Sequence, residues 1–183
     1  MAERAAQDNR LFKFVVLAIL ILIFITVATV KIWELRIAAE RVGVLHTLGS
    51  LRSAVGIQLS AVVIREGTAA LTQLDRSNPM RLWSPPPSSY LGEFTAAEAP
   101  DAQGAWYYDL DQQMLIYRVR FTDYFTTDNS DYPGLARYQL RFDYHDNNSD
   151  QLFDPTIDTA IAVSLQPVDR YHWLLEPSPI VTP

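Results

Sequence analysis

The chain has 183 residues, about the size of one domain, and a formal net charge of −6 from 15 basic and 21 acidic side chains. It contains no cysteine, which excludes disulfide frameworks, zinc ribbons and cysteine nucleophiles. Residues 1–76 carry nine basic and six acidic side chains, a net charge of +3. Residues 77–183 carry six basic and fifteen acidic side chains, a net charge of −9, and the two parts add up to −6. Because phosphate binding needs clustered positive charge, and the acidic part has no lysine, we expect no nucleic acid as a partner.

An apolar stretch near the N-terminus predicts a transmembrane helix over 11–33. Residues 14–30 read FVVLAILILIFITVATV, and Lys13 and Trp33 flank them where lysine and tryptophan usually meet lipid headgroups. The alternatives are a cleaved signal peptide, which is normally shorter, and a buried core helix. Residues 1–10 are too short for a domain, so we expect them in the cytoplasm of a bacterium, the helix in the lipid bilayer of the inner membrane, and the remaining chain in the periplasm.

Apolar residues continue after this stretch at three- and four-residue spacing, which predicts an amphipathic helical extension within 34–76. No proline occurs before Pro79, so we expect one continuous helix to about Glu66, where Gly67 ends it. A short second helix is expected from Ala69 to Asp75.

Three glycines, Gly43, Gly49 and Gly56, interrupt the extension, and each weakens a helix in water by about 1 kcal/mol relative to alanine. Their neighbours are small as well, so another backbone can come close. Two interpretations are open. We favour the one in which the glycines accommodate the chain's own β-sheet, and the other is that they pack against the helix of a partner protein.

The acidic part predicts a small β domain over 77–176. Residues 77–103 combine turn signals with apolar side chains, and we expect them to form an ordered loop that wraps the domain. One face of the sheet needs a cover, and the amphipathic helix is the only long element available, so the expected fold class is α+β, a long N-terminal helix packed on a small antiparallel β-sheet. A Pro-rich tail, 177–183, is expected to be disordered or to cover an edge. The candidate strands are 105–109, 114–121, 137–144 and 159–168, with a hairpin between the first two.

The order of these elements resembles the architecture of type IV pilins and of the pseudopilins of type II secretion. The local sequence is similar to the pilin-like biogenesis proteins of mannose-sensitive haemagglutinin (MSHA) pili, in particular the F-type biogenesis protein. The similarity covers most of the chain. It rests on Asn78-Pro79, Pro86-Pro87, Tyr90-Leu91-Gly92-Glu93, Gly104-Ala105-Trp106-Tyr107-Tyr108-Asp109 and Leu115-Ile116-Tyr117-Arg118-Val119.

The chain departs from the pilin pattern at the processing site. Pilins have a glycine immediately before the peptidase cut and a glutamate at the fifth position after it, whereas here Arg10 precedes Leu11 and the next acidic residue is Glu34. The resemblance therefore implies an unprocessed, single-pass accessory or scaffold protein. It would assist the assembly of an MSHA-like type IV pilus or a type II secretion system by packing against the other assembly proteins. The alternatives are a true minor pseudopilin and an extracytoplasmic module that binds Ca²⁺ or another ligand.

An acidic loop after the third candidate strand has the spacing of a calcium-binding loop. Asp146, Asn148, Asp150 and Asp154 place oxygen side chains at its positions 1, 3, 5 and 9, and some pseudopilins carry calcium in a similar loop. The glycine expected at position 6 is Gln151. The alternative is a solvated hairpin loop rich in Asx turns.

No pattern of catalytic residues is present. The histidines His46, His145 and His172 fall in different predicted elements, and the chain has no nucleophile-elbow, zinc-protease, P-loop or dinucleotide-binding motif. We expect no enzymatic activity and no cofactor other than Ca²⁺.

Overall fold

The structure is a computed structural model that describes the backbone of residues 2–174 and the side chains of residues 12–174. The chain divides into two compact units, Met1–Glu40 and Arg41–Pro183. The predicted tail, 177–183, lies outside the described residues.

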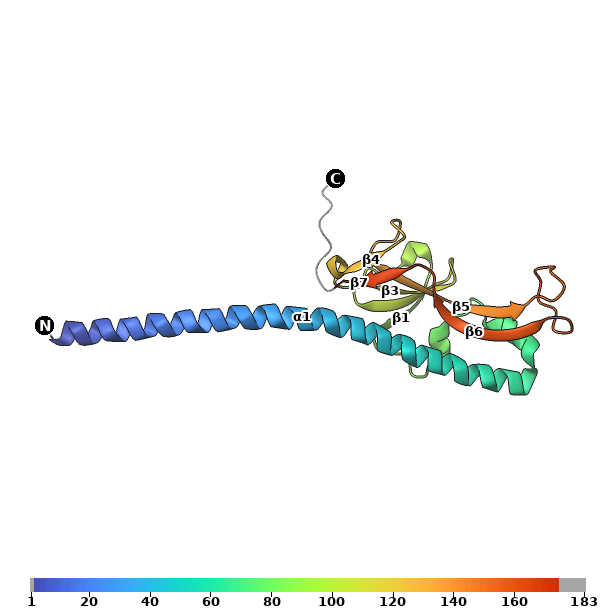
Figure 1. Cartoon of the computed structure of the whole chain (residues 1–183), viewed down its shortest axis with the longest axis horizontal. Helices are drawn as coiled ribbons and strands as arrows, with labels where there is room; N and C mark the ends of the chain where they lie inside the picture. The colour runs from blue at the N-terminus through green and yellow to red at the C-terminus, as the bar shows by residue number, and fades with distance from the viewer. Residues whose placement is uncertain (1, 175–183) are drawn as a thin grey trace. The chain divides into compact units, whose positions relative to one another are not determined.

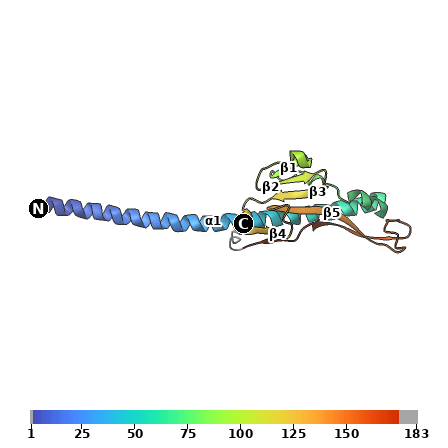
Figure 2. The same cartoon turned by 90° about the horizontal axis from the view of Figure 1, so that it is seen from above.

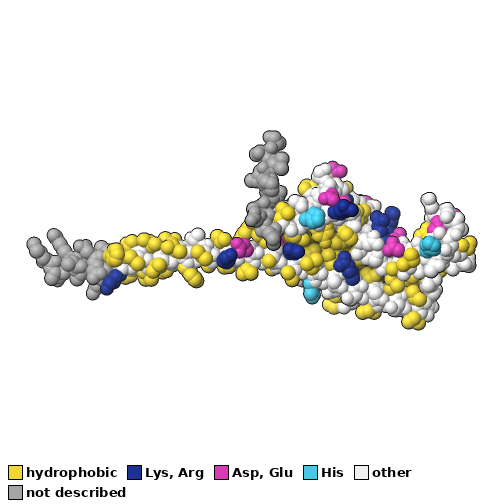
Figure 3. All heavy atoms as spheres, in the orientation of Figure 1, with side chains coloured by type: hydrophobic (Ala, Val, Ile, Leu, Met, Phe, Trp, Pro, Cys, Tyr) yellow, Lys and Arg dark blue, Asp and Glu magenta, His cyan; other side chains and the backbone are white. Residues whose placement is uncertain are grey.

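The first unit is formed by helix α1 (Ala2–Glu66), whose residues 41–66 belong to the second unit. From Phe12 onward α1 is long and apolar enough to cross a membrane. A signal sequence near the N-terminus meets the same criterion of length and composition. No part of its most apolar 18-residue window is buried, so the alternative of a buried core helix does not describe it. In Figure 3 hydrophobic side chains cover this part of the helix. The first unit is therefore a candidate membrane span.

The predicted end of the helix is confirmed. Glu66 is the last residue of α1, and Gly67 has a φ of 82°, a left-handed conformation in which a side chain would be strained. The short α-helix predicted over 69–75 is instead the 3₁₀ helix η1 (Thr68–Leu74). A second 3₁₀ helix, η2 (Pro79–Leu82), begins after Asn78, whose side chain accepts a hydrogen bond from the backbone N–H of Met80.

Five strands form the main sheet of the second unit, in the order β1-β2-β3-β5-β6 (Figures 1 and 2). All four predicted strands are present, and the hairpin between β2 and β3 is confirmed. The loop prediction for 77–103 was incomplete, because β1 lies within it and pairs with β2 in parallel. The other neighbours are antiparallel. The strands are β1 (Tyr90–Phe94), β2 (Ala105–Asp109), β3 (Met114–Arg118), β5 (Leu135–His145) and β6 (Thr159–Pro167).

Two short strands, β4 (Phe125–Thr127) and β7 (Tyr171–Trp173), form a separate antiparallel pair that the sequence did not reveal. Two more 3₁₀ turns, η3 (Ala96–Glu98) and η4 (Thr122–Tyr124), lie in the connections. With three residues each, these elements are too short to show a periodic pattern.

One face of the main sheet packs against the second part of α1, and we call it the helix-facing face. Val44, Leu48, Leu51 and Val55 of α1 are buried in one cluster with aromatic and aliphatic side chains of the sheet. This burial confirms the α+β class and the predicted cover. The main strand residues in the cluster are Trp106, Tyr108, Leu115, Tyr117, Tyr138, Leu140, Val163 and Leu165.

The opposite side of the sheet, the second face, is buried as well, which the sequence did not predict. The side chain of Arg137 is only 6% exposed and makes a bidentate ion pair with Asp169, at 2.6 and 2.8 Å. Its guanidinium carbon lies 4.0 Å from the centre of the Tyr132 ring. Ile116, the neighbour of Arg137 on β3, is 2% exposed. The connection before β5, which carries Tyr132, and the connection after β6, which carries Asp169, therefore cover part of this face with polar groups.

Candidate functional site

The second unit has three candidate sites: the exposed side of α1, the acidic loop, and a cavity beside η2. The three histidines lie in three different elements, His46 in α1, His145 at the end of β5 and His172 in β7. Within residues 12–174 no group of three His, Asp or Glu side chains is arranged to hold a metal ion.

The three glycines of α1 do not face the sheet. Gly43, Gly49 and Gly56 are exposed, and a Cβ atom added at any of them would have nothing within 4 Å. The favoured interpretation, that they accommodate the chain's own sheet, is therefore wrong. The sheet instead packs on the face that carries Leu48 and Leu51, where large side chains fill the space. Contact with a partner helix stays a prediction.

Two of these glycines belong to an uncharged row on the exposed side of α1, which we call the exposed stripe. Its members follow one another at intervals of three or four residues, so they share one side of the helix. Val42 and Ile64 at its two ends are 63% and 83% exposed, and the middle has only small side chains. The exposed stripe consists of Val42, Leu45, Gly49, Ser53, Gly56, Ser60 and Ile64.

The serines of the exposed stripe do not need water as a partner. The hydroxyl groups of Ser53 and Ser60 donate to the carbonyl oxygens of Gly49 and Gly56, each at 3.0 Å. The middle of the stripe therefore presents a shallow and nearly apolar surface on which a second helix can approach closely.

The acidic loop does not converge on a cation. Both oxygens of Asp146 accept backbone N–H groups, from Ser149 at 2.6 Å and from Gln151 at 2.8 Å, and these bonds lower the pKa of Asp146. The side chains of Asn148 and Asp150 accept backbone N–H groups two residues further on.

Asp154 behaves in the same way: it accepts the backbone N–H and the hydroxyl of Thr156, and the pKa of Asp154 is lowered. The loop thus matches the second interpretation of its sequence, a hairpin loop built of Asx turns. Ca²⁺ binding by Asp146, Asn148, Asp150 and Asp154 receives no support from this geometry.

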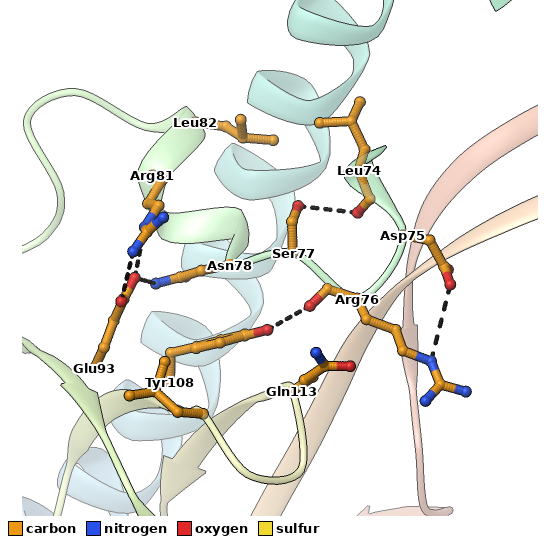
Figure 4. A pocket seen from close by; sticks show the side chains of 11 residues that line it. Leu74, Asp75, Arg76, Ser77, Asn78, Arg81, Leu82, Glu93, Tyr108 and Gln113 are labelled. Carbon is orange, nitrogen blue, oxygen red and sulfur yellow. Dashed lines mark hydrogen bonds and ion pairs between the residues drawn. The ribbon is translucent and has the colours of Figure 1, made fainter. Parts of the chain in front are cut away.

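A cavity of about 440 Å³ lies where η1 and η2 meet β1 and the β2–β3 hairpin, and we call it the Tyr108 cavity (Figure 4). Leu74, Leu82 and Leu110 supply apolar wall, together with the ring of Tyr108. Volumes of about 300 to 1,000 Å³ are usual for small-ligand sites. The other side chains of its lining are Asp75, Arg76, Ser77, Asn78, Arg81, Glu93 and Gln113.

Asn78 organises one side of the Tyr108 cavity. It is 5% exposed, and its amide nitrogen donates to the hydroxyl of Tyr90 and to Glu93, at 2.7 and 2.8 Å. Arg81 donates to both carboxylate oxygens of Glu93, each at 2.6 Å. The hydrogen bonds from Arg81 and then from Asn78 hold the pKa of Glu93 below its usual value.

Tyr108 closes the opposite side, where its hydroxyl donates to the backbone carbonyl of Arg76. Burial is the main cause that raises the pKa of Tyr108 to about 12. The backbone N–H of Arg76 donates to the carbonyl of Leu140 at 2.9 Å, and the Asp75 carboxylate accepts the N–H of Phe142. The segment Asp75–Arg76 therefore ties the cavity to β5.

No pattern in the sequence predicted this cavity. Asn78-Pro79 and Tyr90-Leu91-Gly92-Glu93 stood out only as similarity to pilin-like proteins and as turn signals. The asparagine before a proline is, however, a helix N-cap signal that could have placed η2. No local signal could have shown that Glu93 and Tyr108 meet it, because strand pairing brings them there.

Comparison of the chain with protein-family models, with curated proteins and with solved structures gives no match. The architecture by itself, a long apolar N-terminal helix packed on a β-sheet, is pilin-like.

Proposed function

We propose that this protein is a single-pass, pilin-like accessory protein that assists the assembly of an MSHA-like type IV pilus or a type II secretion system. It acts by protein packing and not as an enzyme. Residues 1–10 lie in the cytoplasm and the β domain in the periplasm. The candidate membrane span and the pilin-like architecture support this function.

The observation that carries the proposal is the exposed stripe of α1. A helix that only covers its own sheet usually turns charged side chains to water on its other side. Here Arg52 is the one charged residue between Val42 and Ile64, and it lies beside the stripe, as does Ile57, which is 72% exposed. Such a surface suits a helix of another assembly protein anchored in the same membrane.

The N-terminal sequence supports a role outside the filament. Arg10 stands where pilins have the glycine of the processing site, and the first acidic residue after it is Glu34. The protein should keep its first ten residues. The mass of the intact protein isolated from membranes tests this, and recovery of a shortened chain in sheared filaments would indicate a minor pseudopilin instead.

The absence of cysteine makes the packing surface easy to test. Ser53→Cys places one thiol in the exposed stripe, and Glu66→Cys places one at the end of α1, away from it. We expect a short thiol-to-thiol cross-linker to join the Ser53→Cys variant to single-cysteine variants of the other membrane-anchored assembly proteins, and the Glu66→Cys variant to remain uncrosslinked. Equal yields from the two positions would contradict the proposal.

Substitution of the glycines separates packing from stability. Because the space beyond Gly49 and Gly56 is open, alanine at either position should raise the free energy of unfolding by about 1 kcal/mol. Leucine at both positions should fold equally well but fill the middle of the stripe, so that surface pili or secretion are lost. Normal assembly with the leucine variant, present at normal levels in the membrane, would refute a role for the stripe.

A further inference from the structure

Residues 41–62 of α1 contain an eleven-residue sequence repeat. The stretch 41–51 reads RVGVLHTLGSL and the stretch 52–62 reads RSAVGIQLSAV. Both units have arginine at the first position, valine at the fourth and leucine at the eighth, and both have a small residue at the third, ninth and tenth positions. Eleven residues make three turns of helix, so equivalent positions lie on the same side of α1, about 16 Å apart.

The repeat determines what each side of α1 presents. Five of the six side chains at its fourth, eighth and eleventh positions are buried, and the sixth, Leu59, packs against the same cluster. The ninth position, Gly49 and Ser60, lies in the exposed stripe, and the first position, Arg41 and Arg52, lies beside it. The sheet explains the repeat on the buried side only. The exposed side keeps its arginines and small residues at the same period, as a surface that packs against a second regular element does.

Arg41 and Arg52 lie along one edge of the exposed stripe, which we call the arginine edge. Both side chains are exposed, and neither takes part in an ion pair among the described residues. From Arg41 to Arg65 the chain has three arginines and no aspartate or glutamate, although its net charge is −6. Charges along the edge of a helix-packing surface set the choice of partner. The arginine edge therefore favours a partner with negative charge.

The other edge of the exposed stripe carries no carboxylate. His46 and Ile57 lie there, also eleven residues apart, and both are exposed. Two copies of this chain anchored in one membrane would pack their α1 helices in parallel, so the arginine edge of each would face His46 and Ile57 of the other. Four arginines would then meet without a carboxylate, and like charges across an interface disfavour it. A second copy of this chain is therefore not the occupant.

We propose that the exposed stripe binds an acidic helix of a different membrane-anchored protein. Small or aliphatic side chains of that helix lie on Gly49, Ser53 and Gly56, and two of its carboxylates, about eleven residues apart, pair with Arg41 and Arg52. This pairing rests on the proposed function, in which both helices leave the same membrane. Charge pairs at the rim of an interface determine which helix binds more than how tightly it binds.

The double substitution His46→Glu and Ile57→Glu tests the pairing without a known partner. It places two carboxylates where a second copy faces Arg41 and Arg52, so the chain itself supplies the acidic helix. Full-length chains that carry Glu66→Cys, labelled there with donor or acceptor dyes, are mixed in phosphatidylcholine vesicles, and energy transfer measures self-association.

We expect the glutamate variant to self-associate about tenfold more tightly than the parent chain, because each of its carboxylates meets an arginine of the other copy. Equal association of the two chains, whether weak or tight, would overturn the proposal. Weak association of both would show that carboxylates are not selected, and tight association of both would show that a second copy occupies the stripe.

Two further chains show whether the new carboxylates act through the arginine edge. His46→Gln with Ile57→Gln changes the same positions without adding charge, and it should associate like the parent chain. Arg41→Gln and Arg52→Gln, added to the glutamate variant, should abolish the gain. All four positions are exposed, so each chain should keep the melting temperature of the parent. A gain that survives the loss of both arginines would contradict the assignment.

Assembly in cells separates this pairing from the proposed function. Arg41→Glu with Arg52→Glu reverses the arginine edge and should lower surface pili or secretion about tenfold, whereas Arg65→Glu makes the same change of charge away from the exposed stripe and should leave assembly normal. Normal assembly with the reversed edge, together with its loss when Gly49 and Gly56 are leucine, would refute the acidic partner and leave the proposed function intact. Normal assembly with both chains would refute the proposed function as well.

Discussion

The two faces of the main sheet are buried by different means. The helix-facing face is covered by one long element, residues 41–66 of α1, through aliphatic side chains such as Leu48 and Leu51. The second face is covered by short connections, and its buried arginine, Arg137, is neutralised by Asp169 and stacked on Tyr132. An apolar cover can tolerate a shifted side chain, whereas a buried ion pair fails when one partner is missing. The two faces should therefore respond differently to substitution.

Removal of the cover tests the helix-facing face most severely. A chain of residues 77–183 lacks the α1 and η1 side chains that complete the core, so it should aggregate and show no cooperative unfolding. A chain of residues 34–183 retains that cover and lacks the apolar stretch, so it should be soluble and folded. Circular dichroism during heating checks both chains. Cooperative melting of the shorter chain would show that the sheet does not depend on α1.

Loss of the ion pair tests the second face. Asp169→Ala leaves the Arg137 guanidinium buried without its partner, and it should lower the free energy of unfolding by about 3 to 5 kcal/mol. Asp131→Ala, at an exposed position in the same region of the chain, should cost less than about 0.5 kcal/mol. Urea unfolding of the 34–183 chain measures both values. A similar small effect from the two substitutions would mean that the pair does not hold this face closed.

A matched pair of leucines compares the covered and exposed sides of α1. Leu51 is 0% exposed in the core, and its replacement by alanine should cost about 3 kcal/mol. Leu45, in the exposed stripe, is 51% exposed, and the same replacement should cost less than about 0.5 kcal/mol in the isolated protein. Urea unfolding measures both costs, provided that the dependence of the free energy of unfolding on urea concentration is the same in the two variants. Equal costs would place the exposed stripe inside the fold.

Acid should weaken the second face before the helix-facing face. The hydrogen bonds from Arg137 are the main cause that lowers the pKa of Asp169, so its contribution to stability is present above the ordinary aspartate pKa of about 3.9. That contribution is lost as the pH falls through the lowered pKa, below about 3.9. The free energy of unfolding should therefore drop more steeply below about pH 3.9 in the parent chain than in Asp169→Asn. Parallel curves for the two chains would contradict this.

The helix-facing face was largely readable from the sequence, because its two layers have simple periods. Three- and four-residue spacing placed Leu48 and Leu51 in a helix, and alternation placed Tyr138 and Leu140 on one side of a strand. The same spacing could not tell which uncharged side of α1 meets the sheet. The glycines suggested the wrong side, since small residues allow close contact with any neighbour, whether it is the chain's own sheet or another protein.

The second face and the Tyr108 cavity were not predictable, because they are built from connections. Arg137 forms its ion pair with Asp169, which lies 32 residues later in the chain. Asn78 donates a hydrogen bond to Glu93, which lies 15 residues later. Neither separation has a local pattern. β1 escaped prediction for a related reason: a five-residue strand that contains Gly92 and pairs in parallel resembles an irregular loop in sequence.

The distance along the chain between Arg137 and its partner also sets an order of events while the chain is being made. A chain that is synthesised from its N-terminus contains Arg137 long before Asp169, which lies 32 residues later in the chain. The second face therefore closes only when nearly the whole chain has emerged. A product that ends before residue 169 would carry an unneutralised arginine and an open second face, and proteases would be expected to remove it.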